Sequence, residues 1–298
     1  MSLSPGAVQQ FRDRGFVVVP DLLGPADLSP LIAEIEDWVD HRARELFARG
    51  QIQDPCEEEP FERRYARLHA QSPWMAAGLD VHLMRGRAMF ELLRSPRLLD
   101  AVESLVGPEI LLNPIHHLRG KLPQPQVHPS VDTYFNVPWH QDSAVMWEEA
   151  DPVPVVGLWI PLVDATEENG CMEILPDVAA GGHLPHQAEG GTTIVPERLP
   201  RVEPVRVECR RGGVVFQDKF TPHRSTPNRS QGVRWSLDVR YQPADRPTGR
   251  PFHPAFVVRS ASAPERCVRD HGAWSRAWEA ALFALSERPA PPAHRVVR

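Results

Sequence analysis

Residues 232–241 read Gly-Val-Arg-Trp-Ser-Leu-Asp-Val-Arg-Tyr, and this strict alternation predicts a β-strand with two unlike faces. One face is apolar and suited to packing under helices: Val233, Trp235, Leu237, Val239 and Tyr241. The other face is polar: Arg234, Ser236, Asp238 and Arg240. A polar face inside a barrel is costly unless it binds something, so the strand points to a ligand site. The alternatives are a solvated face, or one whose charged residues merely pair with neighbours.

Short β runs precede this strand from residue 110 onward. They lie at 110–118, 155–165, 171–175, 192–195, 203–208 and 213–217, separated by proline, glycine, asparagine and aspartate. The chain holds 32 prolines in 298 residues, against a usual share of ~5%. Because proline removes a backbone donor, this density argues against a helical bundle or coiled coil. We therefore expect a mainly β fold with flanking α-helices, a cupin-like double-stranded jelly roll.

The N-terminal third, residues 1–109, is predicted to be mainly helical. A strand at 16–20 is followed by a helix that ends near Gly50, a loop at 54–59 and helices at 87–95 and 97–106. These helices should pack on a jelly-roll core at 110–245, and a C-terminal extension carries a helix at 271–285. No repeat or linker interrupts the chain, so 1–285 is expected to form a single domain. Residues 286–298 are rich in proline and predicted to be a flexible tail.

Composition excludes several classes of function. The net charge is −6, from 33 basic and 39 acidic residues, which argues against a nucleic-acid partner. No apolar run approaches the ~18 residues of a membrane span, and the N-terminus has no secretory signal. Four widely spaced cysteines suggest reduced thiols. We expect a cytoplasmic protein that acts on a small-molecule substrate, as a monomer or a dimer.

A metal site is predicted from His140, Asp142 and His223. On a strand, residues two apart point to the same side, so the triplet at 140–142 would place an imidazole and a carboxylate together. His223 follows a later β run and could return to the same barrel mouth. Two histidines and one carboxylate leave coordination positions open, as in non-haem Fe(II) oxygenases. The triplet alone is weak evidence, but Arg234 stands eleven residues after His223 on the polar strand face.

The order of these motifs resembles the phytanoyl-CoA dioxygenase family of Fe(II)- and 2-oxoglutarate-dependent oxygenases. That family shows a His-Gln-Asp triplet, a tryptophan-bearing strand, an Asn-Gly turn, a Leu-Pro pair, a distal histidine with Ser, Asn and Ser behind it, and an arginine eleven residues after that histidine. The matching residues here are His140-Gln141-Asp142, Trp159, Asn169-Gly170, Leu175-Pro176, His223, Ser225, Asn228, Ser230 and Arg234. The resemblance covers residues 8–245.

The resemblance implies roles for the site residues. His140, Asp142 and His223 would bind Fe(II), and Arg234 would hold the distal carboxylate of 2-oxoglutarate. The guanidinium suits that carboxylate because it offers a fixed bidentate fork. Ser225 would add a hydroxyl donor and Trp159 would line the same pocket. His117 lies where the family places a residue of the cosubstrate pocket; the alternative is that His116 and His117 are a strand pair without a role at the metal. Lys121 is expected to be a charge at a loop edge.

The implied activity is the oxidation of a C–H bond. Such an enzyme would use Fe(II), 2-oxoglutarate and O2, release succinate and CO2, and hydroxylate or otherwise oxidise a small organic or acyl substrate. Asp142 argues against a halogenase, because related halogenases carry a small residue at that position. Two other readings remain open: a non-catalytic cupin-like module that binds a metal or ligand, and a zinc-type hydrolase.

The substrate side is less well defined. Aromatic and thioether side chains near the first ligand pair are predicted to contact substrate: Tyr134, Phe135, Met146 and Trp147. Trp139 is expected to fill the barrel core instead. Where the family has Pro-Gly-Ser-His, this chain has the longer turn 176–183, which leaves inferences from that turn in doubt. The glycine-rich stretch 181–186 is predicted to be a mobile lid over the site.

Overall fold

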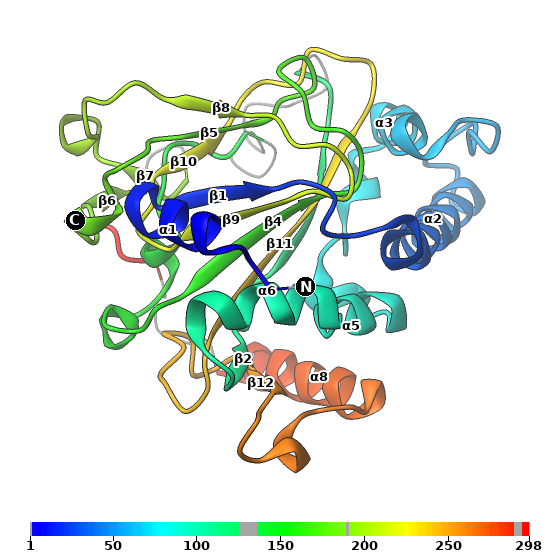
Figure 1. Ribbon diagram of the computed structural model, residues 1–298. Helices are drawn as coiled ribbons and strands as arrows, with labels where there is room; N and C mark the ends of the chain where they lie inside the picture. The colour runs from blue at the N-terminus through cyan, green and yellow to red at the C-terminus, as the bar shows by residue number, and fades with distance from the viewer. Residues whose placement is uncertain (1, 125–135, 189–190, 289–293, 298) are drawn as a thin grey trace.

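The computed structural model describes residues 2–124, 136–188, 191–288 and 294–297, which fold into two sheets with helices outside the larger one (Figure 1). The larger sheet has seven strands in the order β1-β9-β4-β11-β2-β12, with β3 also paired to β11. All of its pairings are antiparallel. The strands are β1 (Phe16–Val19), β2 (Ile110–Leu112), β3 (His117–Lys121), β4 (Val156–Pro161), β9 (Val214–Asp218), β11 (Arg234–Pro243) and β12 (Phe256–Arg259).

The smaller sheet has the order β10-β5-β8 and closes the other side of the barrel. Its strands are β5 (Met172–Ile174), β8 (Val205–Val207) and β10 (His223–Ser225). An apolar cluster joins the two sheets, because Trp159 and Val215 of the larger sheet pack with Met172 and Ile174 of the smaller one. A two-stranded ribbon, β6 (His186–Gln187) and β7 (Thr193–Ile194), lies apart from both. These two facing sheets confirm the predicted jelly roll.

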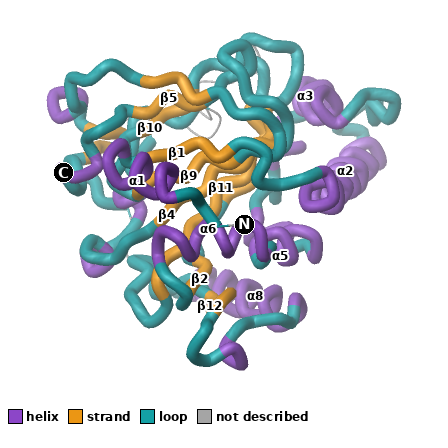
Figure 2. Tube along the Cα trace, viewed as in Figure 1, coloured by secondary structure: helices purple, strands orange, loops and turns teal. Residues whose placement is uncertain are grey.

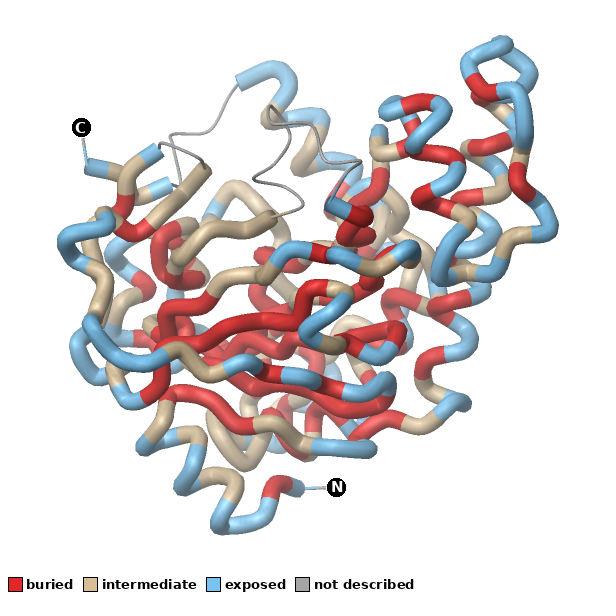
Figure 3. Tube along the Cα trace, turned by 90° about the horizontal axis from the view of Figure 1, so that it is seen from above, coloured by how far each residue is buried: buried red, intermediate tan, exposed pale blue. Residues whose placement is uncertain are grey.

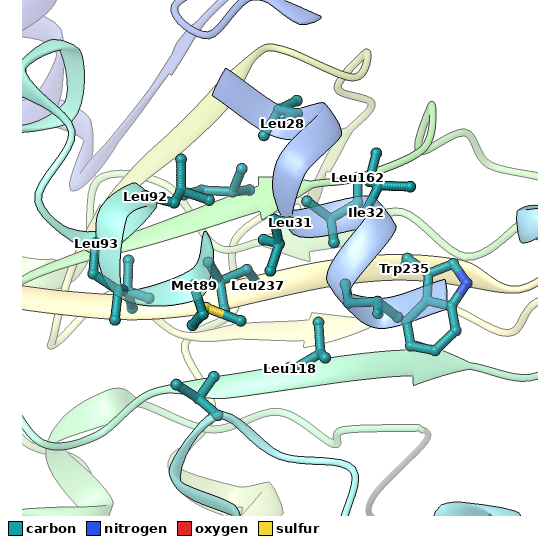
Figure 4. Close-up of a cluster of buried hydrophobic side chains, with 14 of the residues drawn as sticks. Leu28, Leu31, Ile32, Met89, Leu92, Leu93, Leu118, Leu162, Trp235 and Leu237 are labelled. Carbon is teal, nitrogen blue, oxygen red and sulfur yellow. The ribbon is translucent and has the colours of Figure 1, made fainter. Parts of the chain in front are cut away.

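Helices cover the outer face of the larger sheet. They are α1 (Pro5–Arg14), α2 (Pro25–Ala48), α3 (Phe61–Gln71), α4 (Val81–Met84), α5 (Arg87–Leu93), α6 (Pro96–Val106) and α8 (His271–Glu287). Figure 2 shows α2, α5, α6 and α8 on one side of the strands and β5 and β10 on the other. Leu31 of α2, Met89 of α5 and Leu237 of β11 meet in the main core (Figure 4). The outer surfaces of the helices are exposed whereas the central strands are buried (Figure 3).

Local sequence explains where helices begin and end. Ser4 caps α1 by accepting a hydrogen bond from the Ala7 amide, and Gly15 ends that helix with a φ of 79°, which glycine adopts without strain. Helix α2 starts with proline at its first position, where no backbone donor is needed, and Asp27 accepts the amide of Gly24 at 2.7 Å. Such caps fix where α1 ends and α2 begins, and both helices pack on the main core.

Strand β11 carries the predicted two-faced pattern. Its apolar residues lie in the main core under the helices, and Arg234, Asp238 and Arg240 line a cavity on the inner side. The strand pairs with β4 along one edge and with β2 and then β3 along the other. Strand β11 therefore positions Arg234 and Arg240 from the larger sheet, while His223 and Ser225 come from β10 of the smaller sheet.

Three predictions about elements need correction. The run 110–118 is two strands, because Asn113 leaves the ladder and bonds Gln242 and the Ile115 amide with its side chain. Helix α3 was not predicted, although Phe61, Tyr65 and Leu68 recur at helical spacing. The tail is not loose at its described end: the Arg295 amide donates to the Ala144 carbonyl at 2.8 Å, and the Val297 amide donates to the His186 carbonyl at 2.7 Å.

Among the described helices, none combines the length and the apolarity that crossing a bilayer requires.

Candidate active site

The structure brings the three predicted ligand residues together. Donor atoms of His140, Asp142 and His223 all lie within 4.8 Å of one another. The two histidines form a small antiparallel bridge, in which each amide donates to the other's carbonyl at 3.0 Å. Their ring centroids are 4.1 Å apart. Within the described part of the chain this is the one group of three or more such side chains that could hold a metal ion.

The triplet at 140–142 does not lie on a regular strand, contrary to the prediction. His140 makes only the single bridge, Gln141 is extended, and Asp142 begins a 3-10 turn, Asp142–Val145. The two ligands still meet because the extended Gln141 directs its own side chain away from them. That side chain donates to the carbonyls of Gly182 and Phe220, at 2.9 and 2.6 Å, and accepts from the Leu184 amide at 2.7 Å.

Hydrogen bonds set the ring orientation of both histidines. Nδ1 of His140 lies 2.9 Å from the Pro138 carbonyl oxygen, and Nδ1 of His223 lies 3.0 Å from that of Thr221. A carbonyl only accepts, so each Nδ1 carries the proton and each Nε2 presents a lone pair, as metal-binding imidazoles require. His223 Nε2 also lies 3.1 Å from the side-chain nitrogen of Gln217. A metal bound at Nε2 would replace this contact.

Electrostatics favours the protonation states that bind metals. Burial lowers the pKa of His140 well below its usual value, so the ring is neutral. Burial alone would raise the pKa of Asp142, but Arg240 and His223 outweigh it and hold that pKa below its ordinary value. Oδ2 of Asp142 is buried and has no hydrogen-bond partner among the described residues. An orphaned carboxylate oxygen beside two imidazole lone pairs fits a divalent cation.

Arg234 lies in the cavity beside this group. It is 2% exposed, donates to Ser236 Oγ at 2.7 Å, and its guanidinium carbon lies 5.0 Å from the ring centroid of Trp159. Burial lowers its pKa to about 10, which leaves it charged at neutral pH. In the described part of the structure no carboxylate lies within ion-pair distance of Arg234.

The other cavity guanidiniums are already paired. Arg119 bonds Asp238 at 2.7 Å, Arg240 bonds Asp142 at 2.5 Å and Arg224 bonds Glu173 at 2.6 Å. A buried cation needs a counter-charge, and Arg234 is the cavity-lining arginine that has no acidic partner in the described structure. We therefore expect an anionic ligand beside Arg234. Ser225 and Trp159, both predicted for the same pocket, line this cavity too.

Lys121 is a correction to the sequence analysis. It is 1% exposed, lies on β3 in register opposite Arg234, and donates to Ser225 Oγ at 3.1 Å. The β3–β11 pairing buries it, which the loop-edge expectation did not foresee. His117, on the same strand, is not among the cavity-lining residues; its Nδ1 lies 3.0 Å from Asp80 Oδ2.

Two of the four predicted substrate residues lie in the described part of the structure. Tyr134 and Phe135 lie outside the described residues. Met146 is buried in a small cluster with Ile115, Ala150, Val153 and Val155, so it fills a satellite core rather than the cavity. Trp147 is half-buried, with its ring 5.8 Å from that of Phe252. Neither side chain lines the cavity beside the metal group.

Two predictions about the surroundings were wrong. Trp139 does not fill the core: it is half-buried under the guanidinium of Arg224, 4.8 Å from the ring centroid. The stretch 181–186 is tied down rather than free, because His186 accepts the Gln141 amide at 3.1 Å in addition to the bonds from the Gln141 side chain. Sequence reasoning also missed the contact between Arg240 and Asp142; the polar strand face was the only signal for it.

The sequence profile of a known family, phytanoyl-CoA dioxygenase (PhyH), matches residues 11–236. The chain belongs to the phytanoyl-CoA dioxygenase family. This confirms the resemblance inferred from the motifs. As a member of that family, the protein is a 2-oxoglutarate-dependent oxygenase whose cofactor is Fe(II) and whose cosubstrates are 2-oxoglutarate and O2.

Individual relatives are distant. The L-proline trans-4-hydroxylase of Streptomyces griseoviridis is 26% identical over 196 residues, which are 58% of this chain and 69% of that protein. The peroxisomal phytanoyl-CoA dioxygenase of Homo sapiens is 22% identical and aligns over 79% of this chain and 67% of its own. Among solved structures, the apo form of the non-haem monooxygenase ThoJ superposes with a TM-score of 0.66 at 21% identity, covering 95% of both chains. That likeness shows a shared fold.

Proposed function

We propose that this family member hydroxylates, or otherwise oxidises, a C–H bond of a small organic or acyl substrate, with Fe(II) held by His140, Asp142 and His223. The supporting observation is the group of three donors, of which Asp142 and His223 are buried and His140 is half-buried, and in which one carboxylate oxygen has no partner among the described residues. Two imidazoles and one carboxylate leave adjacent coordination positions open for a cosubstrate.

Arg234 is proposed to bind the distal carboxylate of 2-oxoglutarate. The cavity offers that carboxylate a buried guanidinium with no acidic partner in the described structure, as well as the hydroxyl of Ser225. Trp159 packs against the guanidinium and so fixes its plane. Arg234 is the cavity-lining guanidinium that has no carboxylate partner among the described residues, and such a charge suits one end of a dicarboxylate, whose other end would face the metal group.

Bound iron and 2-oxoglutarate supply the oxidising chemistry: substrate C–H, 2-oxoglutarate and O2 become substrate C–OH, succinate and CO2. The protein's own residues do the rest. Arg234 and Ser225 set the direction of the cosubstrate, while burial of Asp142 and His223 limits the access of water to the reacting centre. The imidazole of His140 stays unprotonated at neutral pH, which keeps it available as a metal ligand.

The substrate is proposed to be a small molecule, and the named relatives favour neither of two classes. One is named for an amino acid and the other for an acyl-CoA. The cavity wall carries the ion pair of Arg119 and Asp238, which offers both signs of charge. A screen for succinate release should therefore cover free amino acids, carboxylic acids and acyl thioesters.

An anaerobic titration tests the proposal. Adding Fe(II) and then 2-oxoglutarate to the metal-free protein should produce a weak visible metal-to-ligand charge-transfer band. Asp142→Ala should lose the band and succinate release. Asp238→Asn, which changes a cavity carboxylate outside the ligand group, should keep the band. Absence of the band in fully metallated protein, or a normal band in Asp142→Ala, would contradict the assignment and favour a zinc hydrolase or a binding module.

A further inference from the structure

The two oxygens of Asp142 have different surroundings. Oδ1 accepts a hydrogen bond from Arg240 Nη2 at 2.5 Å. Oδ2 is buried and has no partner among the described residues. The carboxylate of Asp142 is 1% exposed and Arg240 is 6% exposed, so water does not weaken the pair. Oδ1 also lies 4.0 Å from Nε2 of His223, so Oδ2 is the carboxylate oxygen that has no partner in the described structure.

Arg240 is itself fixed at both ends. Its backbone belongs to β11 and lies in register opposite Gly157 of β4. Its Nη1 donates to the Ile115 carbonyl at 3.1 Å, so the guanidinium cannot swing away without losing a second bond. Gly157 leaves room for the carboxylate: a Cβ atom built there would lie 3.0 Å from Asp142 Oδ2. Arg240 and Gly157 therefore restrict the position of the Asp142 carboxylate before any metal binds.

We propose that Arg240 is a positioning residue for the metal centre, which holds Asp142 Oδ1 so that the carboxylate binds iron through Oδ2 alone. This inference rests on the proposed function, because it takes Asp142 to be an iron ligand. Groups that hydrogen-bond a metal ligand orient it and change its donor strength. Here the group that donates is the charged guanidinium of Arg240 and the ligand that accepts is the carboxylate of Asp142. Such a charge-assisted hydrogen bond is stronger than a neutral one.

An electronic consequence follows from the charge. A guanidinium draws electron density from the carboxylate, so Asp142 donates less to the iron and the metal is a stronger Lewis acid. The iron d electrons are then held more tightly, and the charge-transfer transition to 2-oxoglutarate needs more energy. Removing the charge of Arg240 should therefore move that band to longer wavelength and lower the Fe(III)/Fe(II) potential.

A purely structural ion pair would behave differently. It would contribute to folding stability but leave the spectrum of the iron complex unchanged. The cavity provides a matched comparison, because Arg119 also bonds a carboxylate, that of Asp238, at 2.7 Å, and Asp238 is not in the ligand group. Arg119→Gln removes the same charge from the same cavity without touching a ligand.

The test compares the wild type with Arg240→Gln, Arg240→Lys and Arg119→Gln as anaerobic Fe(II)–2-oxoglutarate complexes. We expect the band of Arg240→Gln to lie at longer wavelength than that of the wild type, Arg240→Lys to return it part of the way, and Arg119→Gln to leave it in place. Thermal denaturation of the metal-free proteins reports folding separately. An unshifted band in folded, metallated Arg240→Gln overturns the proposal.

A second measurement needs no variant. A crystal structure of the wild-type protein with bound metal should show Asp142 coordinating through one oxygen while the other stays on Arg240. Coordination through both oxygens, or Arg240 turned away, would overturn the inference even if the variants failed to fold. Absence of a charge-transfer band in the wild type would instead reject the proposed function, so the two failures are distinguishable.

Discussion

At the scale of single residues, three histidines of this protein differ in what their ring nitrogens contact. His140 and His223 direct one nitrogen to a carbonyl and the other toward the ligand group, whereas His116 has no partner for either nitrogen among the described residues. That His140, Asp142 and His223 come together could be predicted because the motifs have a characteristic spacing. The contact of Arg240 with Asp142 could not, because it joins residues 98 apart through the packing of β11.

Arg234→Lys should raise the KM for 2-oxoglutarate roughly 10- to 100-fold. The reason is that a lysine cannot reproduce the bidentate fork, and a charge-assisted hydrogen bond contributes about 1.5–3 kcal/mol. Steady-state kinetics with varied 2-oxoglutarate measures this. Arg224→Lys is the matched control, since Arg224 lines the same cavity but already pairs with Glu173. An unchanged KM in Arg234→Lys would remove Arg234 from the cosubstrate site.

His116→Phe should make the free energy of unfolding less dependent on pH below 6.5. Burial lowers the pKa of His116 to about 3 from an ordinary 6.5. Between these values the unfolded chain takes up a proton that the folded protein refuses, so stability falls as the pH drops below 6.5. At pH 5.5 this loss is about 1.4 kcal/mol.

Denaturant unfolding at pH 7 and pH 5.5 checks this expectation. The difference in unfolding free energy between the two pH values should be smaller in His116→Phe by about that amount. His41→Phe, at an exposed histidine, should keep the wild-type difference. Equal pH dependence in the wild type and His116→Phe would show that His116 does not titrate in this way.

At the scale of elements, the strands that could be predicted are those with a period of two over several residues. Strand β11 is the clearest case, and it positions both Arg234 and Arg240. Strand β10 has three residues and follows a proline, so no periodicity marked it, although it carries His223. The turn at Asp142 is set by contacts with the 182–186 stretch and with Phe220, which local sequence cannot specify.

Gly157→Ala should weaken metal binding by about 10-fold or more. The added methyl group would lie 3.0 Å from both Asp142 Oδ2 and Gln217 Cγ, so the carboxylate must shift. Calorimetric titration with Zn(II), a redox-stable substitute, measures the affinity. Gly181→Ala serves as the control, because a Cβ atom there meets nothing within 4 Å. An unchanged Zn(II) affinity in Gly157→Ala would show that β4 can shift to make room for the methyl group, although it lies between β9 and β11.

At the scale of the whole molecule, helices, the larger sheet and the smaller sheet form successive layers, and the candidate site lies between the two sheets (Figure 1). The layers could be predicted because proline-separated β runs follow amphipathic helices. The packing of residues 294–297 against β6 could not be predicted from the sequence. Residues 294–297 lie against β6 and the segment after Asp142, held by Arg295, whose guanidinium bonds both oxygens of Asp151 at 2.6 and 3.1 Å.

Arg295→Ala should release this end of the chain. The variant loses a paired, mostly buried guanidinium, and we expect a destabilisation of about 1 kcal/mol. Hydrogen exchange at the amides of Arg295 and Val297, which bond Ala144 and His186, should become faster. Arg44→Ala, which removes an exposed helical ion pair, is the control and should leave both amides protected. Unchanged exchange in Arg295→Ala would mean that the backbone bonds suffice.

The bridge between His140 and His223 also bears on how the protein acquires its metal. The two candidate ligands are 83 residues apart, and their reciprocal backbone bonds form only when the segment at His140 has reached β10 of the smaller sheet. Long-range contacts of this kind form late, because closing the loop costs chain entropy. Iron therefore cannot nucleate folding here, as zinc does in small zinc-binding domains. Because the metal group needs His223 as well as His140 and Asp142, metal loading should report that β10 has reached its place in the barrel.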